Sequence, residues 1–205
     1  MPQTALISIR EALRQGQQDL ATAYLGRPDH KAYLAGRSAL VDRMLSLLWA
    51  QAGLPQSAAL IAVGGYGRSE LYPHSDIDVL IALEAEPTPD IEAGLERLIS
   101  QFWDIGLAVG HSVRTIDECI GAAQSDITIQ TALSESRLIC GQSDLHQRLQ
   151  QTIEQSLAND QFIAAKLAEQ EERHLRYAFS AFSLEPNCKE SPGGLRDLHN
   201  LNWIA

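Results

Sequence analysis

Two aspartates separated by one residue give the clearest chemical signal in the sequence. Asp76 and Asp78 open an apolar stretch, residues 76–83, whose length and composition are typical of a buried strand. Residues two apart on a strand project from the same face, so we expect the two carboxylates to lie side by side. Such a pair suits magnesium (Mg2+), which takes one or two protein carboxylates and completes its shell with water and phosphate oxygens. The spacing predicts that Asp76 and Asp78 are catalytic and hold the metal.

A glycine-rich turn precedes the aspartates. Gly64, Gly65 and Gly67 follow the apolar stretch 58–63, which reads as another buried strand. Glycine has no Cβ atom, so the backbone N–H groups of such a turn can approach a phosphate closely. Arg68 comes next and could add a bidentate contact to phosphate oxygens. We therefore expect the turn to bind a triphosphate whose metal ions lie on the aspartates; either feature alone would be a weak signal.

The elements that must position these residues form a mixed pattern. Apolar spacing of three and four residues predicts helices, short apolar or alternating stretches predict strands, and clusters of proline, glycine and serine predict loops. Helices are expected over residues 9–24, 34–53, 91–103, 116–123, 127–136, 145–157 and 161–182, strands over 58–63, 76–83, 107–114 and 137–140, and a loop over 184–196 before a last helix from residue 197.

This pattern predicts an α+β fold, in which a small mixed sheet is flanked by helices. We expect three parts: an N-terminal helical segment over residues 1–54, a catalytic core over 55–141 and a C-terminal helical region over 142–205. The sequence contains no internal repeat and no low-complexity tract. Its 45% hydrophobic and 20% charged residues are typical of a globular protein and argue against wholesale disorder.

Charge and composition limit the possible partners. The 205 residues include 16 Lys and Arg against 26 Asp and Glu, a formal net charge of −10, and no basic cluster is visible. A protein that follows nucleic acid normally presents a basic surface, so we expect no nucleic-acid partner. No apolar run is long enough to cross a membrane and no secretory signal is recognisable. Three widely spaced cysteines favour reduced thiols, and hence the cytoplasm.

The stretch from Gly64 to Ile81 resembles a known family signature. It reads G-G-Y-G-R-x-E-L-x-P-x-S-D-I-D-x-L-I, which is similar to the signature of the DNA polymerase β-like nucleotidyltransferases. More narrowly, it resembles the N-terminal domain of the bacterial protein-PII uridylyltransferase/uridylyl-removing enzymes. Residues 109–115, 126–131 and 135–138 support the narrow match, and K-E-x-P-G-G-L-R-D at residues 189–197 is its most distinctive part.

The resemblance implies a reaction and a set of roles. Enzymes of this family transfer UMP from UTP to a tyrosine hydroxyl of the nitrogen-signalling protein PII and release pyrophosphate. On that analogy Asp76 and Asp78 would be the magnesium ligands, Gly64 and Gly65 would form the triphosphate turn, and Ser75 would supply a hydroxyl to a phosphate or to the metal shell.

The sequence departs from many polymerase β-like transferases at the third carboxylate. That group normally lies on the next strand, where this chain has Gly110 and His111. An imidazole titrates near neutral pH, so His111 could accept the proton of the acceptor hydroxyl. Asp126 and Glu135 are rival third carboxylates. A fourth alternative needs no dedicated base, because a metal-bound tyrosine hydroxyl can lose its proton to solvent.

Length is the second departure. The resemblance implies a full enzyme several times longer, with a histidine–aspartate hydrolase domain and two sensing domains, whereas this sequence contains no His-Asp dipeptide. We therefore expect a truncated chain without uridylyl-removing activity. Two alternatives stay open at this point: a nucleotide-binding regulatory module without turnover, and a nucleotidyltransferase that acts on another acceptor.

Overall fold

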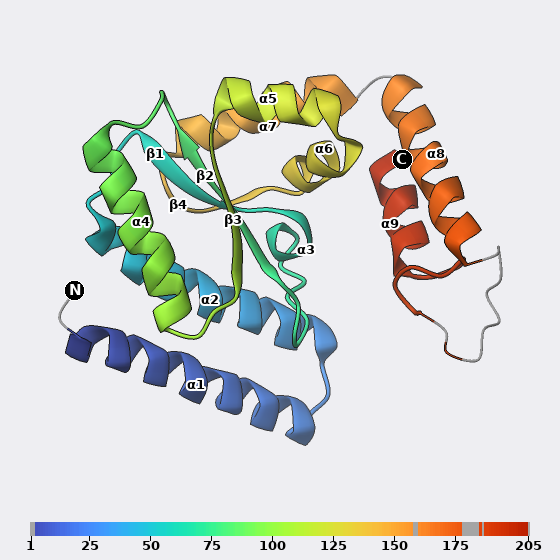
Figure 1. Ribbon diagram of the computed structural model, residues 1–205. Coiled ribbons are helices and arrows are strands. Elements are labelled where there is room, and N and C mark those ends of the chain that lie inside the picture. The colour runs from blue at the N-terminus through green and yellow to red at the C-terminus, as the bar shows by residue number, and fades with distance from the viewer. Residues whose placement is uncertain (1–2, 158–159, 178–184, 186, 205) are drawn as a thin grey trace.

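The chain folds around a four-stranded mixed sheet. The computed structural model describes residues 3–157, 160–177, 185 and 187–204 (Figure 1). The strands are β1 (Ala58–Ala62), β2 (Ile77–Leu83), β3 (Val109–Thr115) and β4 (Arg137–Gly141), in the spatial order β3-β2-β1-β4. The central strand β1 pairs antiparallel with both β2 and β4, whereas β3 joins the outer side of β2 in parallel.

One face of the sheet carries the larger part of the core. Helices α2 (His30–Ala52) and α4 (Pro89–Asp104) cover this face, and α1 (Gln3–Gly26) packs on the outer side of α2 (Figure 1). Helix α2 begins at the N-cap Asp29 and ends at Gly53, whose left-handed φ of 73° suits glycine. The buried side chains that meet here include Met44, Leu45, Leu48, Leu60, Val79, Ile81, Leu98 and Phe102.

Three further helices cover the opposite face. These are α5 (Ile116–Ser125), α6 (Ile127–Ser134) and α7 (Ser143–Leu157). Alternate residues of the same strands point this way, as expected for a pleated sheet that is buried on both faces. The core between the sheet and these three helices includes Ile61, Leu80, Cys119, Leu133, Leu145 and Leu149.

The last two helices form a hairpin beside α6. Helices α8 (Asp160–Arg176) and α9 (Leu195–Ile204) lie side by side, away from the sheet (Figure 1). The one-turn helix α3 (Gly64–Gly67), between β1 and β2, lies on the side of the sheet that faces this hairpin. The hairpin and α3 are therefore the elements that enclose the candidate site.

The predicted fold class is confirmed, with differences at several boundaries. Helix α1 starts earlier than residue 9, and α9 starts at Leu195 instead of residue 197. The predicted glycine turn contains α3, because N–H groups along it donate to carbonyls four or five residues back. Residues 178–182 of the predicted helix 161–182 lie outside the described residues. Helix α7 packs on the sheet beyond the predicted boundary at residue 141, so the division 1–54, 55–141 and 142–205 stays a prediction.

Candidate functional site

The glycine turn is shaped by two different requirements. Gly64 has a φ of 58°, in the left-handed region that favours glycine. A Cβ atom on Gly67 would lie 1.9 Å from the carbonyl oxygen of Glu135, so this glycine permits the chain after α6 to pass close by. Gly64 and Gly65 line a pocket that also includes Ser75 and Asp78. Gly67 is buried outside this pocket and donates its N–H to the carbonyl of Val63. The predicted phosphate contact of Gly67 is therefore corrected to a packing role.

The two aspartates lie at the beginning of β2. Asp78 is the second residue of the strand and Asp76 precedes it, so only Asp78 lies on the strand itself. The carboxylate of Asp78 opens into the pocket. Desolvation by the surrounding protein, followed by the negative charge of Asp76, raises the pKa of Asp78, while the positive charge of Lys189 acts in the opposite direction. The two carboxylates thus repel each other at the edge of a pocket.

The chemistry of this pair fits a divalent cation. Among the described residues no group of three or more His, Cys, Asp or Glu side chains is arranged to hold a metal ion. Asp76 and Asp78 form a pair of carboxylates. Magnesium is commonly bound in this way, with phosphate and water oxygens as the other ligands. A cation between Asp76 and Asp78 would also remove the repulsion that raises the pKa of Asp78.

Arg68 lies in the pocket but is already engaged by carboxylates. Its Nε donates to Glu70 at 2.8 Å and its Nη1 donates to Glu135. Burial acts against the charged guanidinium, but the charges and hydrogen bonds of Glu135 and Glu70 outweigh it and raise the pKa of Arg68. The predicted bidentate contact between Arg68 and a phosphate stays a prediction, and it requires the phosphate to compete with these two carboxylates.

The pocket has a volume of about 460 Å³, in the range of small-molecule sites. One wall comes from the core around the sheet and the other from the α8–α9 hairpin. The core wall includes Gly64, Gly65, Arg68, Ser75, Asp78 and Thr128, and the hairpin wall includes Lys166, Lys189, Arg196, His199 and Trp203. Five of the predicted site residues therefore meet in one cavity, with Asp76 beside Asp78.

The pairing of β3 with β2 excludes His111 from this pocket. His111 pairs with Val79, whereas Asp78 pairs with Gly110. Neighbouring residues of a strand point to opposite faces, and Val79 belongs to the core beneath α2 and α4. The side chain of His111 therefore points to the face opposite Asp78, and the structure does not bring this candidate base to the pocket.

The two rival carboxylates are occupied by structural roles. Asp126 is the N-cap of α6 and accepts hydrogen bonds from the backbone and hydroxyl of Thr128, which lower its pKa. Glu135 reaches the pocket, but its carboxylate accepts from Arg68 and from the indole N–H of Trp203. The carboxylates of Asp126 and Glu135 are therefore both engaged by hydrogen bonds within the protein.

The hairpin wall holds residues that sequence reasoning missed. Lys166 is 1% exposed, forms an ion pair with Glu169 and lies 4.2 Å from the ring centroid of Trp203. Desolvation lowers the pKa of Lys166 against the opposing effect of Glu169. Lys166 sits in an ordinary charged helical pattern, and only the fold brings it to the pocket. The sequence thus carried no signal for Lys166, whereas Lys189 and Arg196 in the same wall belong to the distinctive stretch at residues 189–197.

A polar cluster behind the pocket fixes the glycine turn. Arg137 on β4 donates to both carboxylate oxygens of Asp42 on α2, at 2.7 and 3.1 Å. The buried hydroxyl of Tyr66 donates to the same carboxylate at 2.5 Å, and burial raises the pKa of Tyr66 far above its usual range. Arg137 also donates to the carbonyl of Gly67 at 3.3 Å. The cluster ties α3 to α2 and β4.

Comparison with known proteins agrees with this architecture. Residues 49–130 match the family described as Nucleotidyltransferase domain, and residues 161–205 match the family GlnD PII-uridylyltransferase. The chain is 46% identical, over 96% of its length, to the bifunctional uridylyltransferase/uridylyl-removing enzyme of Thiobacillus denitrificans. It is 50% identical, over 80% of its length, to the enzyme of that name from Cupriavidus pinatubonensis. The chain belongs to the family of the bifunctional uridylyltransferase/uridylyl-removing enzymes.

The similarity covers a limited part of these relatives. The chain spans 23% of the length of the Thiobacillus denitrificans protein and 19% of the Cupriavidus pinatubonensis protein. Each of the two matched segments contributes residues to the pocket, and Glu135 in its lining lies between the segments. Gly64, Ser75 and Asp78 lie in the first segment, and Lys166 and Lys189 lie in the second.

Proposed function

We propose that this chain transfers UMP from UTP to a tyrosine hydroxyl of the signalling protein PII and releases pyrophosphate. One observation carries the proposal: the backbone of Gly64 and Gly65, the hydroxyl-bearing Ser75 and the carboxylate of Asp78 line a single pocket. The names of the relatives and of the matched families support a uridylyltransferase that acts on PII. The choice of UTP as nucleotide and of PII as acceptor rests on these names, because the pocket alone identifies neither.

Each side chain has a part in the proposed transfer. The backbone at Gly64 and Gly65 approaches the triphosphate closely, and Ser75 offers it a hydroxyl. The tyrosine oxygen attacks the α-phosphorus, an oxygen–phosphorus bond forms, and the bond from the α-phosphorus to the pyrophosphate oxygen breaks. In this proposal the hydroxyl proton goes to solvent, the alternative that needs no dedicated base.

Asp76 and Asp78 would hold magnesium. When bound there, magnesium neutralises phosphate charge and makes the attacking hydroxyl more acidic. The protein holds these two carboxylates at the edge of the pocket, where their mutual repulsion favours a bound cation.

The proposal includes a protein acceptor in the cytoplasm. The net charge of −10 supports a protein in preference to a nucleic acid. Cys119, Cys140 and Cys188 form no disulfide, which supports a reducing compartment. No helix among the described residues has the length and apolar character needed to cross a membrane.

A transfer assay tests the proposal. Purified chain is incubated with PII protein and with each of the four ribonucleoside triphosphates, labelled at the α-phosphate, with and without magnesium. We expect label on PII from UTP alone and only with the metal. A chain that binds UTP and magnesium but labels no protein would contradict the transfer and favour a nucleotide-binding module.

A further inference from the structure

The cations that line the pocket differ in whether they have a partner. Arg68 pairs with Glu70 and Glu135, Lys166 with Glu169, and Arg196 with Glu190 at 3.4 Å. Within the described part of the chain, the ammonium group of Lys189 has no ion pair or hydrogen bond. Lys189 is exposed to the pocket that also contains Asp78. A lysine held in a pocket without a carboxylate partner is available to an anionic ligand.

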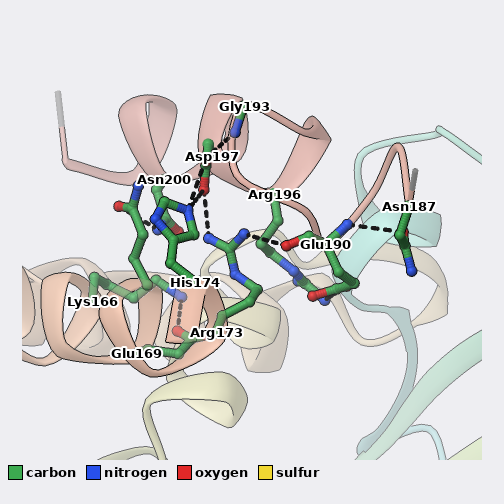
Figure 2. A network of polar contacts seen from close by, with 11 residues as sticks. Lys166, Glu169, Arg173, His174, Asn187, Glu190, Gly193, Arg196, Asp197 and Asn200 are labelled. Carbon is green, nitrogen blue, oxygen red and sulfur yellow. Dashed lines mark hydrogen bonds and ion pairs between the residues drawn. The ribbon is translucent and has the colours of Figure 1, made fainter. Parts of the chain in front are cut away.

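Hydrogen bonds hold the backbone at Lys189 in place. The N–H of Lys189 donates to Oδ1 of Asn187 at 3.0 Å, and its carbonyl accepts from the N–H of Arg196 at 3.0 Å. The N–H of Glu190 donates to the same Asn187 oxygen (Figure 2). A Cβ atom on Gly194 would lie 2.8 Å from the carbonyl oxygen of Cys188, so the turn is tightly closed. Lys189 is thus presented from an ordered turn.

The turn is also anchored to helix α8. Asp197 accepts from the N–H of Gly193 and from the guanidinium of Arg173, both at 2.6 Å, and lies 3.0 Å from Nε2 of His174 (Figure 2). Desolvation would raise the pKa of Asp197, but these hydrogen bonds outweigh it and lower the pKa. Arg173 also donates to the carbonyl of Glu190 at 3.0 Å. These bonds set the position of the turn on the hairpin wall.

Lys189 and Asp78 line the same pocket. Lys189 belongs to the hairpin wall, whereas Asp78 belongs to the core wall. An anion between these walls would therefore meet the carboxylate site on one side and an unpaired ammonium group on the other.

We propose that Lys189 binds the phosphates beyond the α-phosphate of the incoming nucleoside triphosphate and thus the departing pyrophosphate. This inference rests on the proposed function, which supplies the triphosphate. The acceptor must reach the α-phosphorus beside Asp76 and Asp78. Lys189, on the opposite wall, therefore neutralises the charge of the departing pyrophosphate. The ammonium group of lysine is a compact point charge and binds phosphates in this way.

Calorimetric titration of the folded chain with UTP, UMP and inorganic pyrophosphate, each with magnesium, tests this assignment. Lys189→Ala should weaken binding of UTP and pyrophosphate by roughly ten- to a hundredfold, the usual effect of losing a charge-assisted hydrogen bond. UMP lacks the phosphates in question and should bind as it does to the unmodified chain. Lys189→Arg should restore most of the lost affinity, and Lys31→Ala, an exposed change on α2, should alter none of the three.

The outcomes separate this inference from the proposed function. If the unmodified chain binds UTP and labels PII while Lys189→Ala binds UTP equally well, the role of Lys189 is overturned and the function stands. An equal loss of UMP and UTP affinity would also overturn it, because the lysine would then support the pocket as a whole. If the unmodified chain binds neither UTP nor pyrophosphate, the proposed function itself fails.

Discussion

Gly110 lies directly opposite Asp78 in the parallel pairing of β3 with β2. A Cβ atom on Gly110 would lie 2.5 Å from Oδ1 of Asp78. The strand position beside the Asp78 carboxylate is therefore kept free of a side chain, and Gly110 leaves this space to Asp78 alone.

Gly110→Ala should impair the site without unfolding the protein. The added methyl group would displace the end of the Asp78 side chain, which can rotate at little cost to stability. We expect magnesium-dependent UTP binding to fall by roughly tenfold or more, since a misplaced ligand weakens metal and phosphate binding. Gly121→Ala on α5, where a Cβ atom would meet nothing, is the control and should leave binding unchanged. Unaltered UTP affinity in Gly110→Ala would contradict the placement of Asp78.

Replacing either aspartate should separate binding from folding. Asp76→Asn and Asp78→Asn keep the shape of the side chain but remove its negative charge. We expect magnesium-dependent UTP binding to be lost in both variants, with a thermal midpoint equal to or above that of the unmodified chain, because two repelling carboxylates are relieved. Asp104→Asn, at the far end of α4, serves as the control. Equal UTP affinity in all four proteins would disprove the metal assignment.

The cluster around Asp42 should matter more to stability than an exposed ion pair does. Asp42→Asn leaves Arg137 and the buried Tyr66 hydroxyl without their carboxylate, and we expect a loss of about 1–3 kcal/mol in the free energy of unfolding. Glu84→Gln breaks the exposed pair with Arg148 and should cost about 1 kcal/mol or less. Urea denaturation of both variants compares the two values. A smaller loss in Asp42→Asn than in Glu84→Gln would refute the anchoring role of the cluster.

His146 should make stability depend on pH in the mildly acidic range. Burial lowers the pKa of His146, which lies against the hydroxyl of Ser136 at 3.2 Å. The unfolded chain then binds more protons than the folded chain, so the free energy of unfolding falls as pH drops below about 6.5, the ordinary histidine value. His199, whose pKa is lowered by burial and by Arg68, adds to the same slope.

Urea unfolding at pH 7.5 and pH 5.5 measures this slope. His146→Gln should lose less stability between the two pH values than the unmodified chain does. The exposed His30→Gln on α2 is the comparison and should keep the original difference. An unchanged difference in His146→Gln would show that this histidine is not the source of the slope.

Sequence patterns were sufficient for the main strands and for the carboxylate pair, because these features depend on local periodicity. The alternation within the predicted strand 107–114 implies that Val109 and His111 share one face, as they do in β3. It could not show which face that was, because the register between β3 and β2 decides whether His111 or Gly110 lies beside Asp78. This register depends on packing across the sheet, which no local pattern contains.

Sequence reasoning pointed to only part of the second wall of the pocket, the stretch at residues 189–197 that holds Lys189 and Arg196. Lys166 and Trp203 lie about a hundred residues or more from the glycine turn and are brought to it only by the packing of α8 and α9 beside α6. Gly67 shows a different limit. Its residue type correctly indicated a close approach, but the approaching group is the Glu135 carbonyl and not a phosphate.

The most direct test follows the position of the label in UTP during transfer to PII. The unmodified chain and Asp78→Asn are each incubated with PII, magnesium and UTP that carries its label on either the α- or the γ-phosphate. The proposed reaction predicts that α-label becomes attached to a PII tyrosine, that γ-label leaves as pyrophosphate, and that Asp78→Asn does neither. Equal transfer by Asp78→Asn, or γ-label on PII, would contradict uridylyl transfer at this carboxylate site.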